Sequence, residues 1–190
     1  MSAPHNPTLG QGVLYETRVP LSWKPIKQQP DEHQQLALND HNDTVLRTVL
    51  ALEEVGSEHA EEGSGSVQDM VRIEAKVNLV LNLVGQLLAA QSAIPPKASV
   101  CLGAEFLEWS APSVPEPGQW VLIELYLHPS YPRPLRMVGQ IQEPTGRVSA
   151  PAAALTFAGM SEPVRDALEK LIFRHHRRAI AQTRARRTDR

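Results

Sequence analysis

Side chains that could carry out catalysis are few in this sequence and form no recognised catalytic pattern. Its one cysteine, Cys101, lies in an apolar stretch, and no Gly-x-Ser-x-Gly motif presents a serine nucleophile. Glu105, Glu108 and Glu124 fall on predicted strands, but nothing in the sequence pairs them for acid–base chemistry. We therefore predict that the protein is not an enzyme and has no catalytic residue.

The residues that bind metals in proteins are equally scattered. Among the seven histidines, His175 and His176 are neighbours, and on a helix adjacent side chains point about 100° apart, which is unsuitable for chelating one ion. A single cysteine excludes both an intramolecular disulfide and a cysteine-built zinc site. No glycine-rich phosphate loop is present either. The sequence predicts no metal site and no resident cofactor.

Charge is strongly segregated along a chain whose net charge is only -2. Residues 31–66 are an acidic segment with nine acids and one base, whereas residues 161–190 contain nine bases and four acids. Both segments could be solvated surfaces, or one or both could dock a partner of opposite charge. The arginines of the basic segment are accompanied by no aromatic residue beyond Phe173 and no recognition motif, so we predict no nucleic-acid partner.

Length and composition place the chain among globular proteins. It has 190 residues, of which 42% are hydrophobic, and this excludes a wholly disordered chain. Residues 1–11 do not resemble a secretory signal, and we interpret them as a flexible leader. The longest apolar stretch, 77–90, is too short to span a bilayer, so we expect no membrane insertion and a cytoplasmic location.

Two parts of the chain have the pattern of a small antiparallel β-barrel or sandwich. Residues 12–26 are rich in β-forming residues and contain two prolines, which suits an edge strand or a bent strand. After Pro95, short alternating runs are separated by turn residues, and Ser161 offers an N-cap for a closing helix. The predicted strands in this region are 97–109, 119–128, 135–143 and 152–157. We assign 12–30 and 95–185 to one barrel domain of the α+β class.

Residues 38–94 have a different pattern, without proline and with apolar residues in a heptad repeat. Most a and d positions are apolar, and most exceptions fall in 56–66. The apolar runs on the two sides of this gap share one frame, which favours a single long inserted helix. Glycines 56, 63 and 65 each disfavour a helix by roughly 1 kcal/mol relative to alanine, so a helical hairpin remains an open alternative.

The heptad segment also predicts self-association. β-Branched residues at d positions and apolar residues at e and g favour three or four helices over two, although the helix could instead pack on its own barrel. A straight helix of about 50 residues would be roughly 75 Å long, which should keep its acidic part away from the basic C-terminal segment. The residues that we predict at the oligomer interface are Val45, Val49, Leu52, Met70, Ile73, Val77, Val80, Val84 and Leu87.

The order of these elements resembles a PilZ domain, the bacterial receptor module for cyclic di-GMP. The resemblance rests on the strand-like segment 18–21, the Gly-containing segment 100–106, and the barrel and closing helix that follow. The phrases at 73–81 and 172–180 are similar to the atypical, tetrameric PilZ branch, in which a long heptad helix assembles four chains into a parallel coiled coil. This resemblance implies a PilZ-like barrel, a homotetramer and protein partners in cyclic di-GMP or type IV pilus pathways.

Two signatures of PilZ receptors are incomplete in this chain. In the Arg-x-x-x-Arg signature only Arg18 matches, because Leu14 takes the place of the first arginine. In the Asp/Asn-x-Ser-x-x-Gly signature only Gly103 matches, since Ala98 and Val100 replace the polar residues. Each lost charged hydrogen bond is worth roughly 1.5–3 kcal/mol. We therefore expect an oligomeric adaptor with weak or absent cyclic di-GMP binding; the alternative is a receptor with a non-standard site.

Overall fold

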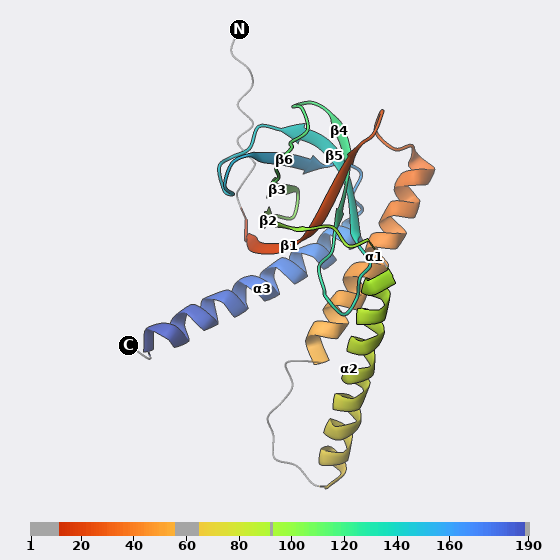
Figure 1. Ribbon diagram of the computed structural model, residues 1–190, viewed down its shortest axis with the longest axis vertical. Coiled ribbons are helices and arrows are strands. Elements are labelled where there is room, and N and C mark those ends of the chain that lie inside the picture. Colours follow the sequence, from red (N-terminus) through yellow and green to blue (C-terminus); the bar gives the residue numbers. More distant parts are fainter. Residues whose placement is uncertain (1–11, 56–64, 92, 189–190) are drawn as a thin grey trace.

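The computed structural model describes residues 12–55, 65–91 and 93–188, so the predicted leader at 1–11 lies outside the described residues. Six antiparallel strands close into a barrel in the order β1-β2-β3-β6-β5-β4 (Figure 1). The strands are β1 Tyr15–Pro25, β2 Lys97–Leu102, β3 Phe106–Ser110, β4 Trp120–Leu125, β5 Leu135–Gln142 and β6 Ala152–Phe157. The helices are α1 Glu32–Val55, α2 Gly65–Gln91 and α3 Glu162–Thr188. This architecture confirms the predicted α+β class and antiparallel barrel.

Strand β1 closes the barrel because its two halves pair with different neighbours. Tyr15 to Pro20 pair with β2, and Leu21 to Pro25 pair with β4. A strand that changes partner must bend, and Pro20 stands at the change, where a missing amide donor is tolerated. The N-terminal half of β1 thereby lies against the strand that contains the second PilZ signature.

The single strand predicted over 97–109 is wrong, because β2 and β3 form a hairpin there. The amide of Gly103 donates to the carbonyl of Phe106 across the turn at 2.9 Å. The aromatic ring of Phe106 packs where a side chain at position 103 would lie, since a Cβ there would come within 2.5 Å of the ring. A larger residue would have to displace this ring, so glycine suits the close approach. The apolar run looks continuous in sequence although the chain reverses.

One core joins the barrel to α1 and α3. Alternate residues of β4, namely Val121, Ile123 and Leu125, point inward and are at most 1% exposed, as their spacing predicted. Both helices contribute apolar residues to the same cluster. They are Val45, Leu46, Val49 and Leu50 from α1 and Val164, Leu168, Leu171 and Ile172 from α3. The closing helix therefore begins where Ser161 predicted it and seals one side of the barrel.

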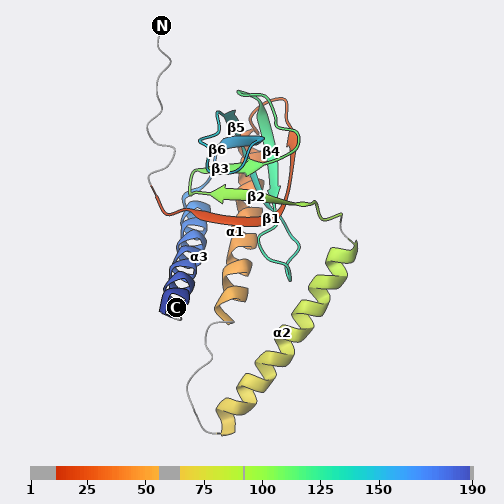
Figure 2. The same cartoon turned by 60° about the vertical axis from the view of Figure 1, so that its left-hand side comes forward.

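The favoured single helix over 38–94 is wrong. Helices α1 and α2 are separate and run in opposite directions, and α2 projects away from the barrel (Figures 1 and 2). Val45 and Val49 are each 1% exposed inside the core of their own chain, so they cannot lie at an interface between copies. The shared heptad frame misled because periodicity shows which face of a helix is apolar but not what covers it.

Candidate functional site

The β1–β2 ladder determines where the incomplete PilZ signatures lie. Val100 is 2% exposed in the core, and Ala98 packs against the same cluster. Side chains alternate along a strand, so Ser99 faces the other side of the sheet, where it is the register partner of Arg18. Neither replaced position could offer a polar side chain to a ligand without disturbing the core.

Arg18 and Gly103, the two matching residues, do not lie together. Arg18 is level with Ser99, four positions before Gly103, which corresponds to about 13 Å along a strand. Arg18 is exposed, whereas Gly103 is buried beneath the ring of Phe106. The structure therefore does not gather the predicted ligand residues into one site.

Gly103 instead borders a cleft between the start of β1, the β2–β3 turn and α3. The cleft has a volume of about 690 Å³, and Leu14 also lines it. Its charged side chains are three acids and one base: Glu105, Asp166, Glu169 and Lys170. Cyclic di-GMP carries two phosphates, so an excess of carboxylates at this position opposes its binding.

The outer face of β2 and β3 is covered by a loop that Glu108 holds. This glutamate is fully buried, and its carboxylate accepts bonds from the amides of Thr145, Arg147 and Val148 and from the Thr145 hydroxyl, at 2.6–3.1 Å. Burial alone would raise the pKa of Glu108, but these bonds outweigh it and lower the pKa. Glu108 is thus a structural anchor, which its sequence context did not reveal.

Cys101 lies in the barrel wall beside this anchor and is completely buried. Burial raises the pKa of its thiol, and this favours the neutral, unreactive form. The arrangement supports the interpretation of Cys101 as a core residue.

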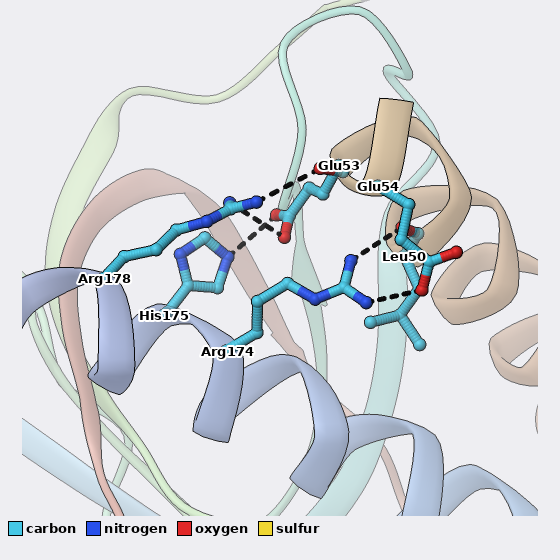
Figure 3. A network of polar contacts seen from close by, with 6 residues as sticks. All are labelled: Leu50, Glu53, Glu54, Arg174, His175 and Arg178. Atoms are coloured by element: carbon cyan, nitrogen blue, oxygen red, sulfur yellow. Dashed lines mark hydrogen bonds and ion pairs between the residues drawn. The ribbon is translucent and has the colours of Figure 1, made fainter. Parts of the chain in front are cut away.

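The basic segment of α3 meets the acidic end of α1 within one chain (Figure 3). Arg174 donates to the backbone carbonyl of Leu50 at 2.9 Å and to Glu54 at 2.6 Å. Arg178 donates to the carboxylate and backbone carbonyl of Glu53 at 3.3 and 3.1 Å. Our expectation that these segments would stay apart was wrong, because Glu53 and Glu54 lie on α1 itself, whose apolar face packs in the same core as α3.

Glu53 is the centre of this network, and its side chain is only 7% exposed. It lies 2.8 Å from Nε2 of His175, whose ring stacks on Tyr15 of β1 with the ring centres 4.1 Å apart. Burial raises the pKa of Glu53, but the His175 hydrogen bond and the charges of His175, Arg178 and Arg174 together lower it. The network thus joins α1, α3 and β1 through a carboxylate that is held in its charged form.

Helix α2 carries most of the large apolar residues that are exposed in the described part of the chain. Of the residues predicted at an interface, those on α2 are exposed to the following fractions: Met70 67%, Ile73 58%, Val77 51%, Val80 57%, Val84 46% and Leu87 63%. Leu52 of α1 lies in a groove with Met70, Ile73 and Val77. We call these six predicted interface residues of α2 the α2 apolar surface.

The C-terminal half of α2 is seated on the loop between β4 and β5. Gly85 is buried there, and a Cβ at this position would lie 2.5 Å from the backbone oxygen of Ser130. The hydroxyl of Ser130 also donates to the side-chain oxygen of Asn82. This contact fixes one end of α2 near the barrel and leaves the α2 apolar surface uncovered.

Comparison with known proteins connects this arrangement to a family. Residues 46–186 match the model of the atypical PilZ domain, which is described as a cyclic di-GMP receptor. The chain belongs to the atypical PilZ domain family. The resemblance proposed from the sequence is thereby confirmed.

A solved structure of another PilZ domain has a similar fold. It is a pathogenic protein from Xanthomonas campestris, described as a tetrameric PilZ domain that self-assembles through a helical bundle. The two chains are 25% identical, with a TM-score of 0.65, and the similarity covers 90% of this chain and 91% of the other. No curated protein matches this sequence.

The described residues of the atypical PilZ chain form neither a membrane-spanning helix nor a metal-binding group. None of its described helices combines the length and apolar content that a membrane span requires. Within the ranges that the structure describes, no group of three or more His, Cys, Asp or Glu side chains is arranged to hold a metal ion.

Proposed function

We propose that this atypical PilZ domain is a non-enzymatic, oligomeric adaptor in which the α2 apolar surface joins copies of the chain into a homotetramer. The observation that supports this most is the exposure of six large apolar residues on one helix. Burying a side chain of this kind stabilises an assembly by about 1.5–3 kcal/mol. Water is an unfavourable neighbour for such a surface, and the X. campestris relative is described as self-assembling through a helical bundle.

Leu52 is included in the proposed interface because it borders the groove between α1 and α2. The groove is lined mainly by apolar side chains from both helices. A helix of a second copy inserted there would contact Leu52 together with Ile73 and Val77. Val45 and Val49 have no part in it, since they are buried within their own chain.

Sedimentation equilibrium of a matched pair of variants tests the assembly. Val84→Asp would place a carboxylate on the α2 apolar surface of every copy, where burying it without a partner is strongly unfavourable. Gln86→Asp adds the same charge to an exposed polar position on the same helix. We expect wild type and Gln86→Asp to sediment as tetramers and Val84→Asp as smaller species. A monomeric wild type would refute the proposal.

We also infer that cyclic di-GMP binding is weak or absent. The inference is supported by the separation of Arg18 from Gly103, the burial of Val100 and the acidic cleft beside Gly103. Three lost polar contacts, each worth roughly 1.5–3 kcal/mol, would raise a dissociation constant by several powers of ten. Calorimetric titration of the intact oligomer with cyclic di-GMP should therefore show no saturable heat.

The rival function is a receptor that binds cyclic di-GMP through a non-standard site, and the family description favours it. A low-micromolar dissociation constant would establish this rival, and Arg18→Ala would then show whether the surviving arginine takes part. In either case we place the protein in the cytoplasm, with protein partners in cyclic di-GMP or type IV pilus pathways, as the resemblance implies.

A further inference from the structure

The cleft beside Gly103 is lined by both apolar and charged side chains. Ile172 and Phe106 are buried, while Val13 and Phe173 are 39% and 51% exposed. These residues come from three separate elements and converge on one concavity of about 690 Å³. That volume lies within the range of about 300–1,000 Å³ that is usual for ligand sites.

The acids of the cleft differ in their partners. Glu105 forms an ion pair with Arg165 at 2.6 Å. The side chains of Asp166 and Glu169, one helical turn apart on α3, make no hydrogen bond or ion pair with another residue that the structure describes. Lys170 points to α1, where it approaches Glu54 at 3.6 Å. The available charge in the cleft is therefore negative, beside exposed apolar side chains.

Aromatic rings near the cleft are already in contact with cations. The guanidinium of Arg177 lies over the ring of Phe173 at 5.9 Å, and that of Arg147 lies over Phe106 at 5.4 Å. A ring in this position attracts a cation through its quadrupole. Arg177 thus already occupies a position over Phe173, and what this half-exposed ring offers an incoming segment is apolar contact.

We propose that this cleft docks a cationic, amphipathic peptide segment of a partner protein, with its apolar side chains against Val13 and Phe173 and its Arg or Lys side chains at Asp166 and Glu169. Charge complementarity selects this occupant, because an anionic ligand would meet two carboxylates that pair with no residue in the described part of the chain. The proposal rests on the adaptor function and names the chemistry of its partner. It is independent of the tetramer test, which measures mass rather than peptide binding.

Fluorescence anisotropy with the intact oligomer tests the site. The probe is a short fluorescein-labelled peptide of alternating Arg and Leu, and a second peptide replaces Leu with Ser. Asp166→Asn with Glu169→Gln should weaken binding of the Arg–Leu peptide about tenfold at low salt, and less at about 1 M salt, where screening is strong. Phe173→Ser should also weaken it, and the Arg–Ser peptide should bind wild type poorly.

The matched control removes two acids elsewhere. Glu116→Gln with Glu143→Gln changes the net charge by the same amount at exposed loop positions, and should leave peptide binding within about twofold of wild type. Equal weakening by both double variants would overturn the proposal, because net charge alone would then explain the binding. Displacement of the peptide by cyclic di-GMP would overturn it too. So would tighter peptide binding by dissociated Val84→Asp, since a second copy would then be the occupant.

Discussion

Helices α1 and α2 have similar heptad patterns in sequence and opposite fates in the structure. On α1, Leu46 and Val49 are at most 1% exposed because the barrel and α3 cover them. On α2, Val80 and Leu87 are 57% and 63% exposed. An apolar stripe therefore predicts burial without identifying the partner: the chain itself covers the stripe of α1 and leaves that of α2 exposed.

Polar contacts distinguish the two helices more clearly than apolar spacing does. Asn42 of α1 is 4% exposed and exchanges two hydrogen bonds with the backbone of Arg136, at 2.7 and 2.8 Å. At the other end of α1, Glu53 and Glu54 bind α3. Among the hydrogen bonds between side chains that the structure describes, α2 takes part in one, which the Ser130 hydroxyl donates to Asn82. Directional polar contacts thus hold α1 against β5 and α3.

The largest expected effect is on the free energy of unfolding of the protein, through the buried face of α1. Leu46→Ala should lower the free energy of unfolding by about 2–5 kcal/mol, because it leaves a cavity at a fully buried position. Leu36→Ala makes the same change on the same helix at a residue that is 60% exposed, and should stay within about 0.5 kcal/mol of wild type. Urea unfolding measures both. Similar losses in the two variants would show that α1 is not seated as described.

A charge reversal tests the contact between α1 and α3. Arg178→Glu should lower the free energy of unfolding by about 1–3 kcal/mol, because it removes two bonds to Glu53 and faces that carboxylate with a like charge. Arg177→Glu alters the preceding residue, which is exposed and lies over Phe173. It should lower the free energy of unfolding much less. Neither variant should dissociate the oligomer. Dissociation by Arg178→Glu alone would place the basic segment at the interface instead.

The smallest expected effect depends on pH. A carboxyl whose pKa is lowered by folding stabilises the fold above its ordinary pKa of 4.5, and this contribution is lost as the pH falls below that value. Glu53→Gln should therefore reduce stability at neutral pH, by about 1 kcal/mol, and make little difference in acid. Unfolding curves of both proteins across this pH range provide the measurement. A constant difference between them would mean that the charge of Glu53 is not what stabilises the network.

Much of the barrel could be predicted from sequence because strand alternation and turn residues are local signals. The inward spacing of β4 and the start of the closing helix directly after Ser161 are examples, and both are confirmed. The β2–β3 hairpin was missed because its turn depends on the ring of Phe106 packing on Gly103, a contact that no periodicity reveals. The role of Glu108 was also hidden, because it depends on a loop almost forty residues away that folds back over the strand.

The α1–α3 network shows the same limit at longer range. The acidic and basic segments were evident from composition, yet they meet only because α1 and α3 pack on the same core. The incomplete PilZ signatures were readable in sequence, but the distance between Arg18 and Gly103 became clear only from the strand register. Sequence patterns predicted most of the strands and the closing helix, but they could not predict the contacts between elements that are distant in sequence.

Hydrogen exchange of wild type at a series of protein concentrations tests the central claim most directly. If α1 is covered by its own chain and α2 by other copies, amide protection over 32–55 should be independent of concentration. Protection over 65–91 should fall as dilution dissociates the oligomer, since binding stabilises by mass action. Protection of α2 that persists unchanged in a monomeric sample, or protection of α1 that falls together with it, would contradict this account.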